Sequence, residues 1–114
     1  ITASGTATLE AAIYGTPMIV TYKVNTLTAL AFLPLVSVKH YALVNIIANR
    51  RIMPEYCQFD AKPELIAAEA LAILRENRLP EMRRHLAEVR KKLGGAGASK
   101  RAAAEVLKVI DERQ

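Results

Sequence analysis

Four residues near the start of the chain have the types and spacing to bind a nucleotide. Ser4, Gly5 and Thr6 form a turn of small and hydroxylated residues between an apolar stretch and a short helical pattern. Gly5 permits unusual backbone dihedrals, Ser4 and Thr6 can cap a helix, and free amides at a helix start carry partial positive charge. A phosphate or diphosphate would bind well at such a turn.

Glu10 is the fourth of these residues. It lies four positions after Thr6, so it falls on the same side of the predicted helix, one turn further on. Its carboxylate could accept hydrogen bonds from two ribose hydroxyls while the amides hold a diphosphate. The alternative is a capped helix whose acidic side chain only complements the helix dipole, and the local pattern leaves both interpretations open.

The surrounding elements form a βαβ pattern. The start of the chain reads as the end of a buried strand, and a short helix follows the turn, with Leu9, Ala12 and Ile13 on its apolar face. Gly15 and Pro17 end this helix, and the apolar residues 18–22 indicate a second buried strand. This order predicts an α/β fold with a parallel sheet, in which ligands bind beyond the carboxyl ends of the strands.

The next segments are less regular. Residues 24–38 carry no charge and predict a helix, capped at Asn25 or Thr26 and bent near Pro34, that is either buried or in contact with a lipid surface. It is too short to cross a bilayer. Residues 41–44 predict a third strand, and residues 52–58 a turn followed by a short helix.

The remainder of the chain is predicted to be helical, which divides it into a core of residues 1–60 and a helical segment of residues 61–114. Asp60 and Pro63 mark one helix start, Pro80 marks the next, and a glycine-rich joint over 94–99 precedes a final helix that Ser99 can cap. The predicted buried faces of the three helices are Ile66, Ala70, Ile73 and Leu74; Met82, Leu86, Val89 and Leu93; and Ala103, Val106, Leu107 and Ile110.

The composition and charge of the chain limit the classes of partner that it could bind. The 114 residues carry a net charge of +5, and the basic excess lies in the second two-thirds of the chain, which favours a nucleotide diphosphate, an acidic membrane or nucleic acid. Aromatic residues make up only 5%, so stacking platforms for single-stranded nucleic acid are poor. The lone Cys57 excludes an internal disulfide and predicts a small buried residue, and with His40 and His85 it makes no metal set. Because Ile1 lies inside a predicted strand, we expect a fragment of a longer protein.

Together these motifs resemble the C-terminal part of lipid-A-disaccharide synthases. The resemblance rests on residues 4–11 (SGTATLEA), 17–20 (PMIV), 22–24 (YKV), 43–50 (LVNIIANR) and 54–58 (PEYCQ), in the expected order and spacing. Val44 and Asn49 stand where the family usually has proline and glycine. The opening motif alone is also similar to other GT-B enzymes that use UDP-GlcNAc, such as the muramyl-pentapeptide glucosaminyltransferase and the 2-epimerases.

The resemblance implies the Rossmann-like C-terminal half of a GT-B glycosyltransferase. The implied hexosyltransferase moves 2,3-diacylglucosamine from its UDP derivative onto 2,3-diacylglucosamine 1-phosphate, forming the β-1,6 disaccharide of lipid A in lipopolysaccharide biosynthesis. By the same resemblance Ser4, Gly5 and Thr6 hold the UDP diphosphate, Glu10 holds the ribose, and Asn45 and Arg50 border the nucleotide. Glu55 and Gln58 match motif positions without an assigned role.

The resemblance also implies where the protein works and what it lacks. It implies no cofactor and no metal. It also implies that the catalytic base lies in the N-terminal half, so we expect no turnover by this chain alone. It further implies a cytoplasmic enzyme, peripheral on the inner membrane of a Gram-negative-type bacterium, with no nucleic-acid partner and with a homodimer formed by exchange of C-terminal helices. A non-enzymatic basic module that binds a membrane or nucleic acid is the competing hypothesis.

Overall fold

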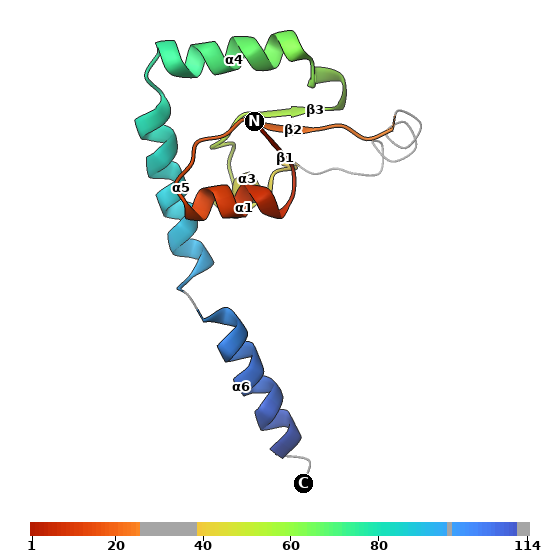
Figure 1. Cartoon of the computed structure of the whole chain (residues 1–114), viewed down its shortest axis with the longest axis vertical. Helices are drawn as coiled ribbons and strands as arrows, with labels where there is room; N and C mark the ends of the chain where they lie inside the picture. Colours follow the sequence, from red (N-terminus) through yellow and green to blue (C-terminus); the bar gives the residue numbers. More distant parts are fainter. Residues whose placement is uncertain (26–38, 96, 112–114) are drawn as a thin grey trace.

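The computed structural model describes residues 1–25, 39–95 and 97–111 of the chain. Its parallel sheet and covering helices confirm the predicted α/β class (Figure 1). In chain order the elements are β1 (Thr2–Ala3), α1 (Thr6–Ile13), β2 (Val20–Tyr22), α3 (Leu43–Ala48), β3 (Glu55–Cys57), a 3-10 turn (Gln58–Asp60), α4 (Pro63–Arg75), α5 (Leu79–Leu93) and α6 (Ala98–Asp111).

Three short strands lie side by side in the order β1-β2-β3. Thr2 of β1 lies opposite Val20 of β2, which in turn lies opposite Glu55 of β3. Val20 is fully buried, as expected for a strand that is covered on both faces. Only the last three residues of the predicted strand over 18–22 pair in the sheet, although Met18 and Ile19 before them are also buried.

Helices cover the sheet on both sides. In Figure 1, α4 lies on one side of the strands and α1 and α3 lie on the other, with α5 on the left, beyond the ends at which β2 and β3 begin. Helix α1 packs against both α3 and α5, and α3 also packs against α5. The largest fully buried apolar side chains are Met53, Leu86, Val20, Val44 and Val89.

Two secondary-structure predictions are wrong. Residues 41–44 do not form a strand, because α3 begins at Leu43 and the place beside β2 is taken by Glu55–Cys57. The short helix predicted over 52–58 is instead strand β3, with one 3-10 turn after it. Periodicity cannot separate a strand from a helix in apolar runs of this length, and pairing with β2 decides the outcome.

Helices α4 and α5 largely follow the prediction. Met82, Leu86, Val89 and Ile73 are buried as predicted, whereas Leu74 is 63% exposed. Pro63 is the first residue of α4, but the helix is preceded by Lys62 rather than capped by Asp60. Cys57 is only half-buried, and burial raises the pKa of its thiol, with a smaller contribution from nearby Glu55.

Helix α6 departs most from expectation. Its predicted buried stripe is exposed, with Val106, Leu107 and Ile110 at 59%, 60% and 50% of their full exposure. Figure 1 shows α6 projecting away from the rest of the molecule, beyond the glycine-rich joint. Ser99 lies inside α6 and not at its cap. The apolar face therefore has no partner among the described residues.

One prediction concerns contact of the chain with a membrane. The described residues contain no helix that is long and apolar enough to cross a membrane. The helix predicted over 24–38 lies almost entirely outside the described residues, which end at Asn25 and resume at Lys39.

Candidate functional site

The turn that follows β1 adopts a conformation that requires glycine. The Ser4 amide donates to the carbonyl of Thr21 at 3.1 Å, which places the turn at the carboxyl end of the sheet. Gly5 then has φ 136° and ψ −161°, a region that residues with a side chain rarely occupy. This conformation lets the chain pass directly from β1 into α1.

Neither Ser4 nor Thr6 caps α1, so that prediction is wrong. The Ser4 hydroxyl instead donates to the carbonyl of Tyr41 at 2.8 Å. The hydrogen bonds at the start of α1 come instead from the buried Thr8, whose amide and hydroxyl both donate to the carbonyl of Gly5, at 3.1 and 2.8 Å. The buried face of α1 is accordingly Thr8 and Ala12, and Ile13 is 43% exposed.

The start of α1 keeps its free amides. Among the described residues, the N–H groups of Gly5, Thr6 and Ala7 donate to no acceptor. Gly5 is half-buried, and both Thr6 and Ala7 are exposed. Free amides at the N-terminus of a helix carry the positive end of its dipole, so this turn is suited to an anion.

Glu10 lies on the exposed surface of the same helix. Its side chain is exposed, and its carboxylate makes no ion pair or hydrogen bond with any described residue. The helical spacing places it on the same face as Thr6. The four-residue arrangement that the sequence predicts is therefore present and open to solvent.

An open pocket of about 360 Å³ adjoins the turn. It is lined by Ser4, Gly5, Tyr22, Tyr41 and Leu43. Tyr22, Tyr41 and Leu43 were not among the predicted site residues. Tyr41 and Leu43 are distant from the turn in sequence and reach it only because α3 packs against α1. A phosphate group on the free amides would lie at the wall of this pocket.

Asn45 lies beneath the site and not at its surface. The side chain is fully buried, and Oδ1 accepts from the amides of Ile52 and Met53 at 2.9 Å each. Nδ2 donates to the Met53 carbonyl at 2.8 Å and to Glu55 Oε1. All four hydrogen-bonding positions of the amide are filled, so a direct contact with a nucleotide would break one of these bonds.

Arg50 also lies away from the pocket. Its guanidinium binds Glu88 on α5 at 2.8 Å and lies 3.3 Å from Nε2 of His85. Leu43, at the opposite end of α3, is the residue that lines the pocket, and six helical residues extend over about 9 Å. The structure therefore does not bring Arg50 to the turn.

The side chains of Glu55 and Gln58 both make hydrogen bonds within the chain. Glu55 Oε2 accepts from the Tyr41 amide at 2.9 Å, and Oε1 accepts from Asn45. The side-chain amide of Gln58 pairs with the backbone of Val24 in both directions, at 3.0 Å each. The side chain of Gln58 thus holds Val24, two residues beyond the end of β2, next to the end of β3.

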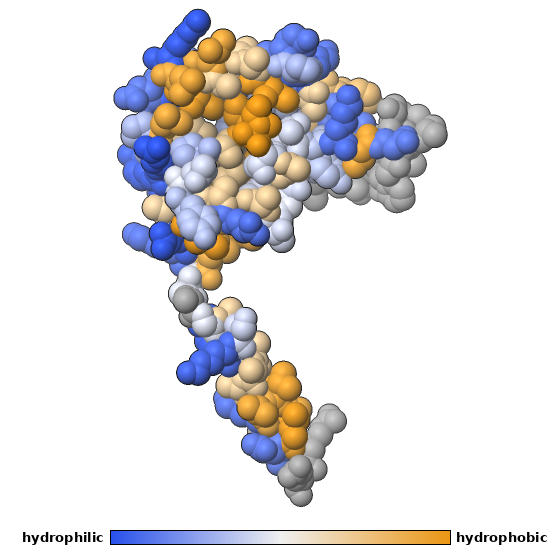
Figure 2. Space-filling model, in the orientation of Figure 1, coloured by the Kyte–Doolittle hydropathy of each residue, from blue (hydrophilic) through white to orange (hydrophobic). Residues whose placement is uncertain are grey.

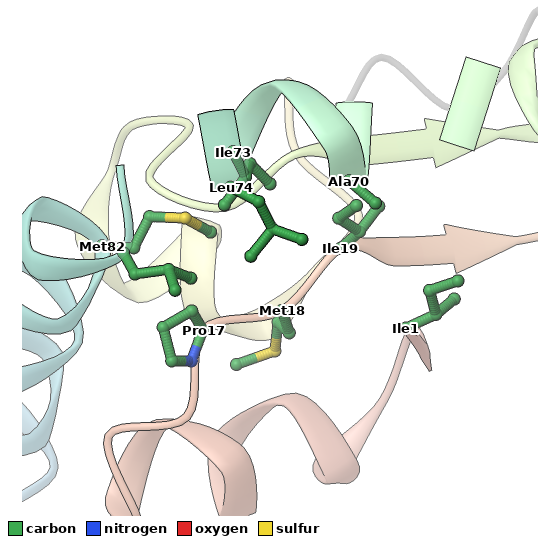
Figure 3. A pocket seen from close by; sticks show the side chains of 9 residues that line it. Ile1, Pro17, Met18, Ile19, Ala70, Ile73, Leu74 and Met82 are labelled. Carbon is green, nitrogen blue, oxygen red and sulfur yellow. The ribbon is translucent and has the colours of Figure 1, made fainter. Parts of the chain in front are cut away.

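Further pockets lie away from the turn. The first is lined by apolar side chains of α4, α5 and residues 17–19, which precede β2, with Leu74 directed toward Met18 (Figure 3). The second contains the Glu69 carboxylate, which binds Arg78 at 3.0 Å and the Tyr56 hydroxyl at 3.3 Å. Burial, followed by the charge of Glu69, raises the pKa of Tyr56. Neither pocket includes the turn. The part of the chain that the structure describes holds no group of three or more metal-binding side chains.

Comparison with known proteins places the chain in a family. A family model described as lipid-A-disaccharide synthetase matches residues 1–109. The chain belongs to the lipid-A-disaccharide synthase family. No solved structure matches it.

Individual lipid-A-disaccharide synthases match over nearly the whole chain. The one from Syntrophus aciditrophicus is 49% identical over 111 residues, which cover 96% of this chain and 29% of the relative. Those from Trichlorobacter lovleyi and Solibacter usitatus are 41% and 42% identical over 113 residues, covering 98% and 97% of this chain and 30% of each relative. The chain thus spans about 30% of the length of the relatives that it matches.

Within this lipid-A-disaccharide synthase chain, the predicted site residues fall into two groups. Ser4, Gly5, Thr6 and Glu10 lie together at the turn and along the exposed side of α1. Asn45 is buried within α3 and Arg50 follows its end, and both side chains already have protein partners. In the first group both donors of Ser4 are also bonded within the chain, whereas Thr6 and Glu10 are exposed.

Proposed function

We propose that this chain is the nucleotide-sugar-binding part of a glycosyltransferase of lipid A biosynthesis. The enzyme transfers 2,3-diacylglucosamine from UDP to 2,3-diacylglucosamine 1-phosphate and forms the β-1,6 disaccharide. Membership of the family supports this assignment. The observation that carries it is the set of free amides at Gly5, Thr6 and Ala7, at a turn whose Gly5 lines an open pocket.

The proposed chemistry follows from the geometry of the turn. Negative charge develops on the leaving diphosphate as the bond to the sugar breaks, and preorganised amides stabilise such charge without rearranging. The free amides of Gly5, Thr6 and Ala7 hold the diphosphate, and Glu10 holds the ribose hydroxyls. Ser4 fixes the turn through its hydrogen bonds to the carbonyls of Thr21 and Tyr41. The reaction needs no metal or cofactor in this proposal. Asn45 acts by ordering the backbone at Ile52 and Met53, and Arg50 links the end of α3 to α5 through Glu88.

The chain alone is proposed to bind nucleotide without turnover. The base that activates the acceptor hydroxyl lies, by resemblance to the family, in an N-terminal half that the matched region does not include. The proposal therefore separates two properties: UDP binding belongs to this chain, and transfer belongs to the whole enzyme, which acts at the cytoplasmic surface of the inner membrane on its two acylated substrates.

Replacing Glu10 with glutamine tests the ribose contact. Hydrogen bonds to a charged acceptor are worth about 1.5–3 kcal/mol, roughly twice those to a neutral one, so we expect Glu10→Gln to weaken UDP binding about tenfold. The effect should vanish for 2′,3′-dideoxy-UDP, which has no hydroxyls to donate. Isothermal titration calorimetry of both ligands with both proteins measures the difference.

The control for this experiment is Glu64→Gln on α4. Glu64 is also exposed but lies on a different helix, so its loss should leave the affinity for UDP unchanged. An equal loss of affinity for UDP and its dideoxy analogue in Glu10→Gln would contradict the ribose contact.

The exposed face of α6 supports the proposed homodimer. Figure 2 shows apolar surface along the far half of this helix, where Val106, Leu107, Val109 and Ile110 are half or more exposed. An amphipathic helix gains stability by covering such a stripe. Exchange of α6 between two copies would cover it.

Sedimentation equilibrium tests the exchange. We expect the chain to form dimers, and Leu107→Lys to shift them toward monomer because a charge would enter the covered stripe. Lys108→Gln, on the charged side of α6, should leave the dimer intact. A fully folded species that stays monomeric at all concentrations would count against helix exchange.

A further inference from the structure

We propose that Glu55 is a positioning residue, which holds the Ser4–Gly5 turn in the orientation that binds a diphosphate. The inference rests on the proposed function of that turn. It assigns a task to a residue that the family resemblance left without one. Glu55 itself does not line the pocket beside the turn.

The carboxylate of Glu55 joins two segments that are distant in sequence. Oε2 accepts a hydrogen bond from the Tyr41 amide at 2.9 Å, and Oε1 accepts one from Nδ2 of Asn45. Glu55 is also fixed at its backbone, since it is paired in the sheet opposite Val20 and its carbonyl accepts from Arg51 Nη2 at 2.7 Å. The carboxylate thus extends from a rigid strand.

Tyr41 connects the Glu55 carboxylate to the turn through two hydrogen bonds. Its amide is held by Glu55, and its carbonyl accepts the hydrogen bond from the Ser4 hydroxyl at 2.8 Å. Tyr41 is therefore held at both ends, once from β3 and once from the turn. Because Ser4 immediately precedes Gly5, the position of Tyr41 sets where the free amides of Gly5 and Thr6 point.

Asn45 prevents the carboxylate from turning away. The Asn45 amide is itself fixed by the backbone of Ile52 and Met53, so its second N–H is aimed at Glu55. Networks of this kind, with every member satisfied, hold a single arrangement. The chain of contacts therefore runs without a gap from Met53 through Asn45, Glu55 and Tyr41 to Ser4.

The chemistry of this network requires a carboxylate. Both partners of Glu55 are donors, a backbone N–H and an amide NH₂, so both side-chain oxygens must accept. Glutamine has almost the same shape but would place its NH₂ group against one of these donors. An isosteric substitution should thus release Tyr41 or Asn45, although it leaves the volume unchanged.

Glu55→Gln is the test, with Glu69→Gln as the matched control. Glu69 is also a part-buried carboxylate that accepts from two donors, Tyr56 and Arg78, but it lies on α4 and does not line the pocket beside the turn. UDP affinity is measured by calorimetry at a temperature below the melting transition of all three proteins, so that loss of fold does not contribute. We expect Glu55→Gln to weaken UDP binding about tenfold and Glu69→Gln to leave it unchanged.

The outcomes distinguish this inference from the proposed function. If the unmodified chain does not bind UDP, the proposed function fails. If it binds UDP and Glu55→Gln binds equally well, the positioning role is wrong. Should Glu55→Gln not fold, hydrogen exchange in the unmodified chain decides: UDP should slow exchange of the Tyr41 amide together with that of Gly5, and protection of Gly5 alone would overturn the inference.

Discussion

Replacing Gly5 with alanine is expected to remove UDP binding. Gly5 has φ 136° and ψ −161°, where a residue with a Cβ is strained by about 1–3 kcal/mol. No atom lies within 4 Å of the added Cβ, so the substitution acts through the backbone and not through a clash. The turn would relax toward an allowed conformation and redirect the amides of Thr6 and Ala7. We expect a loss in affinity of more than about tenfold by calorimetry.

Gly15→Ala is the matched control for this experiment. Gly15 follows the other end of α1, has φ 65°, and also has no atom near the position of a Cβ. Its replacement should lower stability by about 1 kcal/mol through the same kind of backbone strain and leave UDP binding intact. If Gly5→Ala, still folded, bound UDP as well as the unmodified chain does, the turn would not be the diphosphate site.

Replacing Asn45 with leucine is expected to destabilise the chain severely. The substitution leaves the amides of Ile52 and Met53, the carbonyl of Met53 and one oxygen of Glu55 without their partner in a buried site. Each unsatisfied buried group costs about 1–3 kcal/mol, so the loss of four partners is expected to cost at least about 4 kcal/mol. That is comparable with the whole stability of a small domain. Urea unfolding followed by tyrosine fluorescence measures the change, since the chain has no tryptophan.

Asn49→Gly provides the comparison at the end of the same helix. Asn49 is exposed and has φ 55°, a left-handed conformation that glycine adopts freely, so stability should change by less than about 0.5 kcal/mol. A similarly small effect for Asn45→Leu would show that Asn45 does not organise the loop between α3 and β3.

The local pattern at the start of the chain predicts the arrangement of four residues because its constraints are local. A glycine between two hydroxylated residues, followed by a helical period, is enough to place Ser4, Gly5, Thr6 and Glu10 on one turn and one helix face. Those four residues are where the sequence placed them. Their hydrogen bonds were not predictable, since the partner of the Ser4 hydroxyl is Tyr41, which lies 37 residues away along the chain.

The failures of prediction have a common physical cause. Residues 41–44 form a short apolar run that is typical of a buried strand, whereas residues 55–57 include the charged Glu55 and have no strand pattern. The strand beside β2 is nevertheless formed by residues 55–57, and this pairing is a tertiary contact that the local pattern does not encode. The sequence likewise predicts Asn45 to be a surface ligand, but its side chain is buried and makes hydrogen bonds to Ile52, Met53 and Glu55. The apolar stripe of α6 was predicted to be buried because the helix is amphipathic. An amphipathic pattern indicates which face of a helix is apolar, but it does not indicate which surface covers that face.

The most direct test of this account is a titration of the ¹⁵N-labelled chain with UDP, followed by the chemical shifts of its backbone amides. The account predicts that the largest shifts occur at Gly5, Thr6 and Ala7, with smaller ones at Glu10 and Tyr41. Shifts confined to the basic helices α5 and α6, or none at the turn when UDP is saturating, would contradict it.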